Sequence, residues 1–378
     1  MRSTRLFAFG CVLAASALTA TACPGPPAPT WSTAVPLTAG SGVTIGNDWA
    51  VGSSSSSDGN IVAFTSFASN LVAGDTNGAS DLFIRDRQAQ STVRIAQNVQ
   101  APPRISKNAR YVGYQSPAGF SVFDRTTSTV QTWTDLPGAA GPSSPLVSDD
   151  GLSAVYGVGP SFGGFSTACR VRDMTTGVIV SCPPGNGDGG TPGLRAVSDN
   201  ARFVVYSWSG FNGPSPTRLW DRATNTVTML PSTFLSFFTA GISDDGRYLT
   251  TLAAGALPNS YVGARIDLQT NTILNMAANP ASNAFSTSIS PNGRYVGINT
   301  EAALSALDTN GVGDIYVWDT QTGTLRFPAL TPAGGAIPER TEICPGSGTL
   351  LDDGSTCLST TGALDSTDQN LQTDHYRR

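Results

Sequence analysis

The chain has 378 residues, of which only 13% are charged and 41 are glycine, and its formal net charge is −5. An acidic balance without any cluster of Lys and Arg excludes nucleic acid as a natural partner. Lys107 is the only lysine among the 22 basic residues. Low charge, abundant glycine and the lack of long helical periodicity beyond the N-terminus favour many short strands joined by tight turns.

The N-terminus has the pattern of an export signal. Arg2 and Arg5 precede an apolar run over residues 6–18, and small residues follow up to Ala22. This order of charged, apolar and small residues predicts a signal peptide over residues 1–22. The apolar run is too short for a good transmembrane span.

Two interpretations of the cleavage site remain open. Ala20-Thr21-Ala22 is a site for ordinary secretion, whereas Ala20-Thr21-Ala22-Cys23 also resembles a bacterial lipobox, although Leu is commoner where Ala20 stands. Acylation of Cys23 is favoured because this residue is the odd cysteine of the mature chain. Residues 23–30, rich in Pro and Gly, then form a stiff tether.

A short phrase recurs seven times in residues 31–378. In six copies it reads Ser, a variable residue, Asp or Asn, and Gly or Ala, followed in most copies by Arg and an aromatic residue, with a tight β-turn at its centre. The seventh copy, Leu351-Asp352-Asp353-Gly354, is degenerate. The segment after the turn is apolar at successive positions, which is typical of a strand buried on both faces. The Gly or Ala positions are Gly59, Ala109, Gly151, Ala201, Gly246, Gly293 and Gly354, spaced by 42 to 61 residues. This spacing predicts an all-β, seven-bladed β-propeller.

A second signal follows each of the first six copies. It is an aspartate that ends an apolar segment and precedes a short turn and a fourth strand. These residues are Asp86, Asp124, Asp173, Asp221, Asp267 and Asp319. Because they recur from blade to blade, we expect them to be structural, accepting hydrogen bonds from backbone amides of the turn.

The first unit has the most specific pattern. It runs from Ser66-Phe67-Ala68-Ser69-Asn70-Leu71-Val72 through Gly74-Asp75-Thr76-Asn77-Gly78-Ala79-Ser80 into Asp81-Leu82-Phe83-Ile84-Arg85-Asp86. With the recurring phrase, it resembles the TolB-like, WD-repeat-like β-propeller family of bacterial exported proteins. The resemblance covers roughly residues 31–378 and implies the fold, but this scaffold serves many functions. TolB has a further N-terminal domain for which this chain has no room, so we expect no Tol–Pal role.

The two ends of the chain are predicted to share the last blade. The seventh unit stops at a third strand, over residues 374–378, while residues 33–38 resemble a spare fourth strand. We expect these segments to pair and close the ring, with Pro36 tolerated on the outer edge.

Four cysteines form two pairs with the same separation. Cys169 and Cys182 flank the turn between the third and fourth strands of blade three, and Cys344 and Cys357 flank the Asp352-Asp353-Gly354 turn. We expect the disulfides Cys169–Cys182 and Cys344–Cys357. A metal site is the alternative, but the chain has no Cys-x-x-Cys and one histidine.

Signals for catalysis are weak. His375 is the only histidine, and its predicted strand position favours a packed residue over a general base. Acidic pairs such as Asp149-Asp150 and Asp244-Asp245 lie in hairpin turns. We therefore expect no catalytic residue and no cofactor other than a candidate calcium ion.

The candidate calcium ligands share the spacing D-x-N-x-x-x-D in three connections between second and third strands. They are Asp75, Asn77 and Asp81, then Asp308, Asn310 and Asp314, then Asp368, Asn370 and Asp374. Calcium requires six to eight oxygen ligands, more than one such loop supplies by its side chains. The favoured alternative is an Asx-turn that starts the third strand.

The connections over residues 66–80, 301–313 and 361–373 are long and belong to consecutive blades, so they should cluster on one face. Loops on a rigid frame commonly bind ligands. We therefore expect a monomeric, non-enzymatic binding or scaffolding module outside the cytoplasm, attached to a membrane only by its lipid. Its partner would be an envelope protein or an extracellular ligand. The alternatives are a propeller enzyme acting on glycans or peptides from the central channel, and an envelope assembly component.

Overall fold

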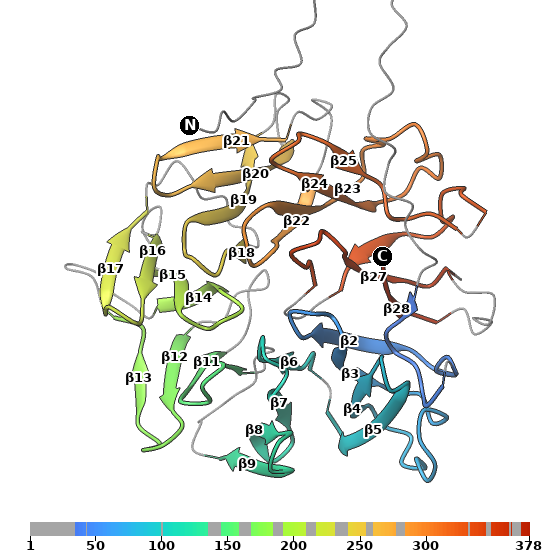
Figure 1. The fold of residues 1–378 in the computed structure, drawn as a ribbon, viewed down its shortest axis with the longest axis vertical. Coiled ribbons are helices and arrows are strands. Elements are labelled where there is room, and N and C mark those ends of the chain that lie inside the picture. The colour runs from blue at the N-terminus through green and yellow to red at the C-terminus, as the bar shows by residue number, and fades with distance from the viewer. Residues whose placement is uncertain are drawn as a thin grey trace, which may run out of the picture. The chain divides into compact units, whose positions relative to one another are not determined.

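Seven four-stranded antiparallel sheets lie side by side around a common centre (Figure 1). In this computed structural model the described residues are 35–42, 44–99, 101–134, 145–158, 168–183, 192–208, 217–230, 241–254, 260–276, 284–331, 333–344, 349–362, 364 and 372–378. The predicted signal peptide over residues 1–22, Cys23 and the 23–30 tether lie outside them. Within these ranges there is no helix, and hence none suited to crossing a membrane. The predicted all-β, seven-bladed propeller is confirmed.

Blades 1 to 6 follow the order of the chain from the inner to the outer strand, whereas the outer strand of blade 7 is β1. Blade 1 contains β2 (Ala50–Ser55), β3 (Ile61–Ser66), β4 (Asp81–Asp86) and β5 (Ser91–Ala96), and blade 2 contains β6 (Arg104–Ile105), β7 (Tyr111–Ser116), β8 (Gly119–Asp124) and β9 (Thr129–Trp133). Blade 3 contains β10 (Leu146–Val147), β11 (Ser153–Val158), β12 (Ala168–Asp173) and β13 (Ile179–Ser181), and blade 4 contains β14 (Pro192–Val197), β15 (Phe203–Trp208), β16 (Thr217–Asp221) and β17 (Thr226–Met229). Blade 5 contains β18 (Gly241–Ile242), β19 (Tyr248–Ala254), β20 (Tyr261–Asp267) and β21 (Thr272–Asn275), and blade 6 contains β22 (Ala284–Ile289), β23 (Tyr295–Thr300), β24 (Asp314–Asp319) and β25 (Leu325–Arg326). Blade 7 joins β26 (Thr341–Ile343), β27 (Cys357–Thr360) and β28 (Asp374–Arg377) to β1 (Val35–Pro36).

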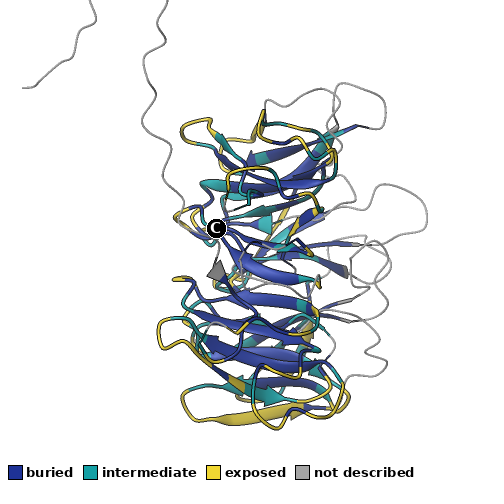
Figure 2. Ribbon diagram, turned by 90° about the vertical axis from the view of Figure 1, so that its right-hand side faces the viewer, coloured by how far each residue is buried: buried dark blue, intermediate teal, exposed yellow. Residues whose placement is uncertain are grey.

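Burial follows the position of a strand within its blade. All residues of β3 and β24 are buried, whereas all residues of the outer strands β17 and β21 are exposed (Figure 2). The middle strands are covered on both faces because neighbouring blades stack against each other. This explains why their sequences are apolar at successive positions.

Whether Gly or Ala occupies the turn of the recurring phrase depends mainly on the space that the neighbouring blade leaves beside it. A side-chain carbon added at Gly246 would lie 2.5 Å from the Phe203 ring, and one added at Gly293 would lie 2.3 Å from Tyr248. Both glycines also adopt positive φ, of 71° and 73°. Ala109 and Ala201 occupy the same turn position where the preceding blade presents no aromatic ring, but Ile61 and Ser153. At four of the five glycine positions, an aromatic ring of the preceding blade therefore fills the space of a side chain, whereas Gly59 faces Leu351.

The recurring arginine connects the second strand of a blade to the third. In blade 5, Arg247 donates to both carboxylate oxygens of Asp267, at 2.7 and 3.1 Å, and its guanidinium lies 4.9 Å from the centroid of the Tyr248 ring. The same pairs in other blades are Arg110–Asp124, Arg202–Asp221 and Arg294–Asp319. These hydrogen bonds, opposed by partial burial, lower the pKa of each of the four aspartates to about 2.

The predicted role of the recurring aspartates is confirmed. Asp267 accepts a hydrogen bond from the amide of Gln269 at 2.9 Å, and each of the other five accepts from an amide two or three residues further on. These carboxylates hold the turn that leads to the fourth strand, as expected of residues repeated in successive blades.

The ring is closed by pairing the two ends of the described chain. Val35 pairs with Arg377 and Pro36 with Tyr376, and the amide of Leu37 donates to the carbonyl of His375 at 2.7 Å. The predicted pairing is therefore present, although Thr33 and Ala34 lie outside the described residues. The side chain of Leu37 is fully buried in a cluster with Val62 and Phe64 of blade 1.

Arg85 of β4 holds the segment that follows β1. Its guanidinium donates to the carbonyl oxygens of Ala39, Gly40 and Gly42. Only 3% of Arg85 is exposed, so these carbonyls share a charged donor away from water. Blade 1 thus binds, through hydrogen bonds from Arg85, the segment that follows the outer strand of blade 7.

Both predicted disulfides are present, Cys169–Cys182 and Cys344–Cys357. The Cα atoms are 5.5 Å apart in each, within the usual range for a disulfide. The first joins the end of blade 3 to its own third strand, and the second joins the inner two strands of the closing blade.

Replacing Arg85 by Ala should loosen the closure. We expect the free energy of unfolding to fall by about 3 kcal/mol, because three buried carbonyls lose a charged donor. Hydrogen exchange of the Leu37 amide should accelerate in Arg85→Ala. The matched control is Arg222→Ala, which removes a buried arginine–carbonyl contact within blade 4. Equal exchange of Leu37 in both variants would contradict the role given to Arg85.

Candidate functional site

The long connections of blades 1 and 6 lie on either side of blade 7. The amide of Thr341, at the start of β26, donates to the carbonyl of Gly313 at 3.1 Å. The amide of Ala50, at the start of β2, donates to the carbonyl of Thr373 at 2.8 Å. The three connections over residues 66–80, 301–313 and 361–373 therefore belong to adjacent blades, as predicted. Much of the third lies outside the described residues.

In blade 1, an arginine lies between the candidate calcium ligands. Arg94 of β5 contacts Asp75 at 3.0 Å and Asp81 at 2.9 Å, so its guanidinium bridges the two carboxylates. Burial and the charge of Asp81 raise the pKa of Asp75, while Arg94 opposes that rise. Asn77 accepts from the amide of Ala79 at 3.0 Å, which is the expected Asx-turn. The chain itself provides the cation that these acids require.

Blade 6 repeats the loop but not the arginine. Asn310 donates to Asp314 at 2.7 Å and accepts from the amide of Val312 at 3.0 Å. Thr341 donates to the other oxygen of Asp314 at 2.7 Å, and the Tyr316 hydroxyl donates to Asp308. Among the described residues no basic side chain pairs with either acid, and burial raises the pKa of Asp314. These acids are satisfied by neutral donors.

In blade 7 only Asp374 of the predicted ligands is described, since Asp368 and Asn370 lie outside the described residues. Asp374 is buried and accepts from the hydroxyl of Thr38 at 3.1 Å. Its carboxylate thus contributes to ring closure. Calcium at these loops stays a prediction, whereas the Asx-turn alternative is seen in blades 1 and 6.

An exposed aromatic pair lies next to the loop of blade 1. Trp49 is 48% exposed, and its ring stacks on Phe67 with centroids 5.2 Å apart and planes 17° apart. The carbonyl of Trp49 accepts from the Phe67 amide and from the Ser66 hydroxyl, both at 3.1 Å. The indole therefore has a fixed position at the surface. No repeat signal marked it, but Trp49 is an isolated tryptophan beside Asn47 and Asp48 in a connection that does not repeat.

The only lysine lies at the opposite end of the blades, among the turns of the recurring phrase. Lys107, in the turn of blade 2, donates to Asp244 in the turn of blade 5 at 2.6 Å. The charges of Asp149 and Asp352, from blades 3 and 7, also act on it. A side chain that meets blades on so many sides of the ring must reach across the central axis. Burial lowers the pKa of Lys107, but the bond to Asp244 and the surrounding acids outweigh it and raise the pKa.

Asparagines and acids of the same turns connect adjacent blades. Asn108 donates through its backbone amide to the carboxylate of Asp149 at 3.0 Å, and through its side chain to the Asp149 carbonyl at 2.7 Å. Asn200 makes the same two contacts to Asp244. The variable position of the phrase is thus the one that faces the axis, where acids predominate and Lys107 supplies the opposing charge.

His375 is buried at the junction of blades 7 and 1. It is 1% exposed, and its Nδ1 atom forms a 2.8 Å hydrogen bond with the hydroxyl of Ser53 in β2. Burial lowers the pKa of His375 to about 4. The predicted packed role is therefore present, and the imidazole is neutral and away from solvent at physiological pH.

One Gly-x-Ser-x-Gly pattern occurs, at residues 159–163, outside the described residues. It connects β11 to β12, two strands of one blade. A hydrolase nucleophile elbow requires a strand-to-helix turn and a histidine within reach. The one histidine of the chain, His375, is buried at the junction of blades 7 and 1.

A groove of about 520 Å³ lies between blades 4 and 5, lined by Met229, Leu230, Leu268, Asp245 and Arg247 among others. Asp245 and Arg247 belong to the recurring phrase, so part of its wall is the repeated unit itself. Met229 is 65% exposed on the outer strand β17. The packing of blades 4 and 5 against each other therefore accounts for this groove.

Comparison with known proteins supports the fold. No family model matches the sequence, and no curated protein matches it. The chain is similar to the solved structure of an oligogalacturonate lyase in complex with manganese, with a TM-score of 0.55 at 13% identity over 88% of this chain and 89% of that one. It is similar to the β-propeller domain of the Trilobed protease from Pyrococcus furiosus, with a TM-score of 0.54 at 11% identity over 84% and 91%. A putative TolB from Agrobacterium tumefaciens matches with a TM-score of 0.43 at 14% identity over 64% and 84%. At such identities the likenesses above 0.5 show a β-propeller fold and nothing narrower.

Replacing Lys107 by Met should destabilise the protein through repulsion among the acids it faces. We expect a loss of about 1–2 kcal/mol at low ionic strength, shrinking as salt screens the acids. Urea unfolding at low and high ionic strength measures both effects. Lys107→Arg, which keeps the charge, is the control. A loss that does not respond to salt would show that packing, not charge, is the contribution of Lys107.

His375 should make the protein sensitive to acid. Its pKa of about 4 in the folded chain lies below its ordinary value of 6.5, so the unfolded chain binds the proton more tightly. Stability is therefore complete above pH 6.5 and is lost as the pH falls from about 6.5 to about 4, by about 3 kcal/mol. Chemical unfolding across this range should show a smaller loss for His375→Gln. If the free energy of unfolding of the wild-type protein and of His375→Gln fell equally between pH 6.5 and pH 4, His375 would not be the source of the acid sensitivity.

Proposed function

We propose that this chain is a non-enzymatic binding module whose contact surface is the loop sector of blades 1, 6 and 7 together with Trp49. The loop sector comprises residues 66–80, 301–313 and 361–373. The observation that carries the proposal is the exposed Trp49 ring, stacked on Phe67 and fixed through its own backbone. Such a large, immobilised aromatic side chain loses little conformational entropy on binding and often dominates the affinity of an interface.

Two further features of the loop sector support the same role. Leu307, in the loop of blade 6, is 53% exposed. Asn47 and Asn70 hold the blade 1 loop against the preceding segment, with the Asn47 amide donating to Asn70 at 2.9 Å. Apolar anchors surrounded by polar groups on a rigid frame are typical of recognition surfaces.

The absence of enzymatic activity is part of the proposal. Its support is that the sole histidine is enclosed between blades 7 and 1, where a substrate has no access. The acids of the blade 1 and blade 6 loops are engaged by Arg94, Tyr316 and Thr341. These contacts leave them poorly suited to moving protons to and from a ligand.

The proposed location is the outer side of a bacterial membrane, with the chain attached through an acylated Cys23. The support is the export pattern over residues 1–22 and the odd cysteine that follows it. The proposed partner is an envelope protein or an extracellular ligand, bound by a monomer.

Single side-chain substitutions test the surface. Capture of proteins from solubilised native envelope and binding to a glycan array should fall about tenfold or more for Trp49→Ala, and less for Leu307→Ala. Met229→Ala is the matched control, because Met229 is also apolar and is 65% exposed, but lies on blade 4. Near-ultraviolet circular dichroism confirms that each variant is folded.

Two outcomes would overturn the proposal. One is a loss of binding in Met229→Ala with unchanged binding in Trp49→Ala. The other is turnover of a glycan or peptide by the purified chain, which would favour the enzymatic alternative.

A further inference from the structure

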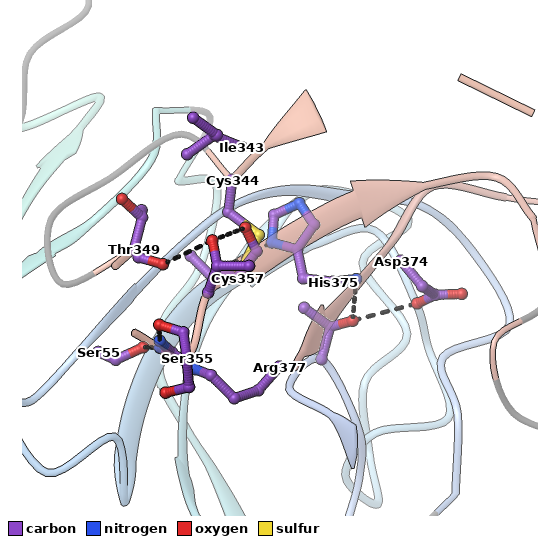
Figure 3. The surroundings of a disulfide bond; sticks show 12 residues. Ser55, Ile343, Cys344, Thr349, Ser355, Cys357, Asp374, His375 and Arg377 are labelled. Carbon is purple, nitrogen blue, oxygen red and sulfur yellow. Dashed lines mark hydrogen bonds between the residues drawn. A yellow bond between two sulfur atoms is a disulfide. The ribbon is translucent and has the colours of Figure 1, made fainter. Parts of the chain in front are cut away.

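The two disulfides have the same separation in sequence but different surroundings. Cys344, Cys357 and His375 each place a ligand atom within 4.8 Å of the other two (Figure 3). Within the described ranges this is the one group of three or more His, Cys, Asp or Glu side chains with such spacing. All three residues are at most 2% exposed. The Cys169–Cys182 pair cannot have an equivalent, because the chain has no second histidine.

A serine from the neighbouring blade completes the cluster. The hydroxyl of Ser53 lies 3.5 Å from Sγ of Cys357 and 2.8 Å from Nδ1 of His375. Cys344 follows β26, Cys357 lies on β27 and His375 lies on β28. The cluster therefore connects blade 7 to β2, the inner strand of blade 1. It lies at the place where the ring is closed.

We propose that reduction of the Cys344–Cys357 disulfide converts this cluster into a zinc site, with the two thiolates and a ring nitrogen of His375 as ligands. Thiolate sulfur and imidazole nitrogen are the ligands that Zn²⁺ prefers in proteins. The Ser53 hydroxyl or a water molecule completes four-coordination. This inference does not depend on the proposed binding surface.

Charge and geometry agree with the site. Two thiolates neutralise Zn²⁺, so the buried ion carries no net charge that would oppose its burial. A ring nitrogen of His375 and both sulfur atoms already lie within 4.8 Å of one another, so the three ligands converge on one point.

The conversion balances in two steps. A dithiol reductant transfers two electrons and two protons, which breaks the sulfur–sulfur bond, gives two thiols and leaves the reductant as a disulfide. Zn²⁺ then displaces the two thiol protons and binds the two sulfur atoms. The Cα atoms, 5.5 Å apart, are close enough for both sulfur atoms to reach one ion. The closing blade thus has two alternative cross-links, a disulfide when oxidised and a metal ion when reduced.

Cobalt titration of the reduced chain tests the proposal. The full chain is reduced with a phosphine, and Co²⁺ is added as a probe, because thiolate-to-cobalt charge transfer produces near-ultraviolet absorption. We expect saturation at one Co²⁺ per chain, displacement by Zn²⁺, and no absorption in the oxidised chain.

Four variants make the test specific. Cys169→Ser with Cys182→Ser should leave the absorption unchanged, whereas Cys344→Ser with Cys357→Ser should abolish it. His375→Gln should weaken binding by at least about tenfold, and Ser53→Ala, which removes the partner that orients the imidazole, by about tenfold. Near-ultraviolet circular dichroism reports folding in each sample.

Each remaining outcome overturns the proposal. These are no charge-transfer band in the reduced chain, a band of equal strength in His375→Gln, and a band that depends on Cys169 and Cys182. Loss of the fold on reduction, without recovery on adding Co²⁺, has the same meaning, because a metal bound only by the folded closure must stabilise it.

Discussion

Closure of the ring is the constraint on which the rest of the structure depends. Both ends of the described chain enter the same blade, because β1 pairs with β28, so backbone hydrogen bonds hold the start of the ring to its last blade. This single pairing is short, so other contacts reinforce it. Arg85 binds the carbonyls that follow β1, and Leu37 is buried against blade 1. The second disulfide and the only histidine lie at the same junction.

Between neighbouring blades, the constraint is one of shape. An aromatic ring of one blade packs on the turn of the next, and the turn carries glycine where that ring leaves no space for a side chain, as Phe203 does at Gly246. Where the ring is absent, the turn carries alanine at Ala109 and Ala201, and glycine at Gly59, which faces Leu351. The arginine beside each ring adds a bidentate bond to the aspartate of its own blade, so one repeated phrase holds both the blade and its neighbour.

The chain satisfies most of its acidic clusters with its own groups. Arg94 bridges Asp75 and Asp81, and Lys107 meets Asp244 across the axis. These contacts explain how loops with the composition of a calcium site are stable as they stand. Among the described residues, Trp49 is an exposed aromatic side chain next to these loops. The proposed binding role follows from this contrast, because the acids already have partners within the chain whereas the Trp49 ring is exposed to solvent.

The amino-acid sequence by itself determined the number of blades, the turns, the structural aspartates, both disulfides and the pairing of the ends, because each depends on local or repeated patterns of residues. It did not reveal the axial position of Lys107, the bridge by Arg94 or the surface position of Trp49. Those features depend on which blades meet across the ring and on which side chains converge from distant strands. Such contacts have no period in the sequence, so only the tertiary structure decided them.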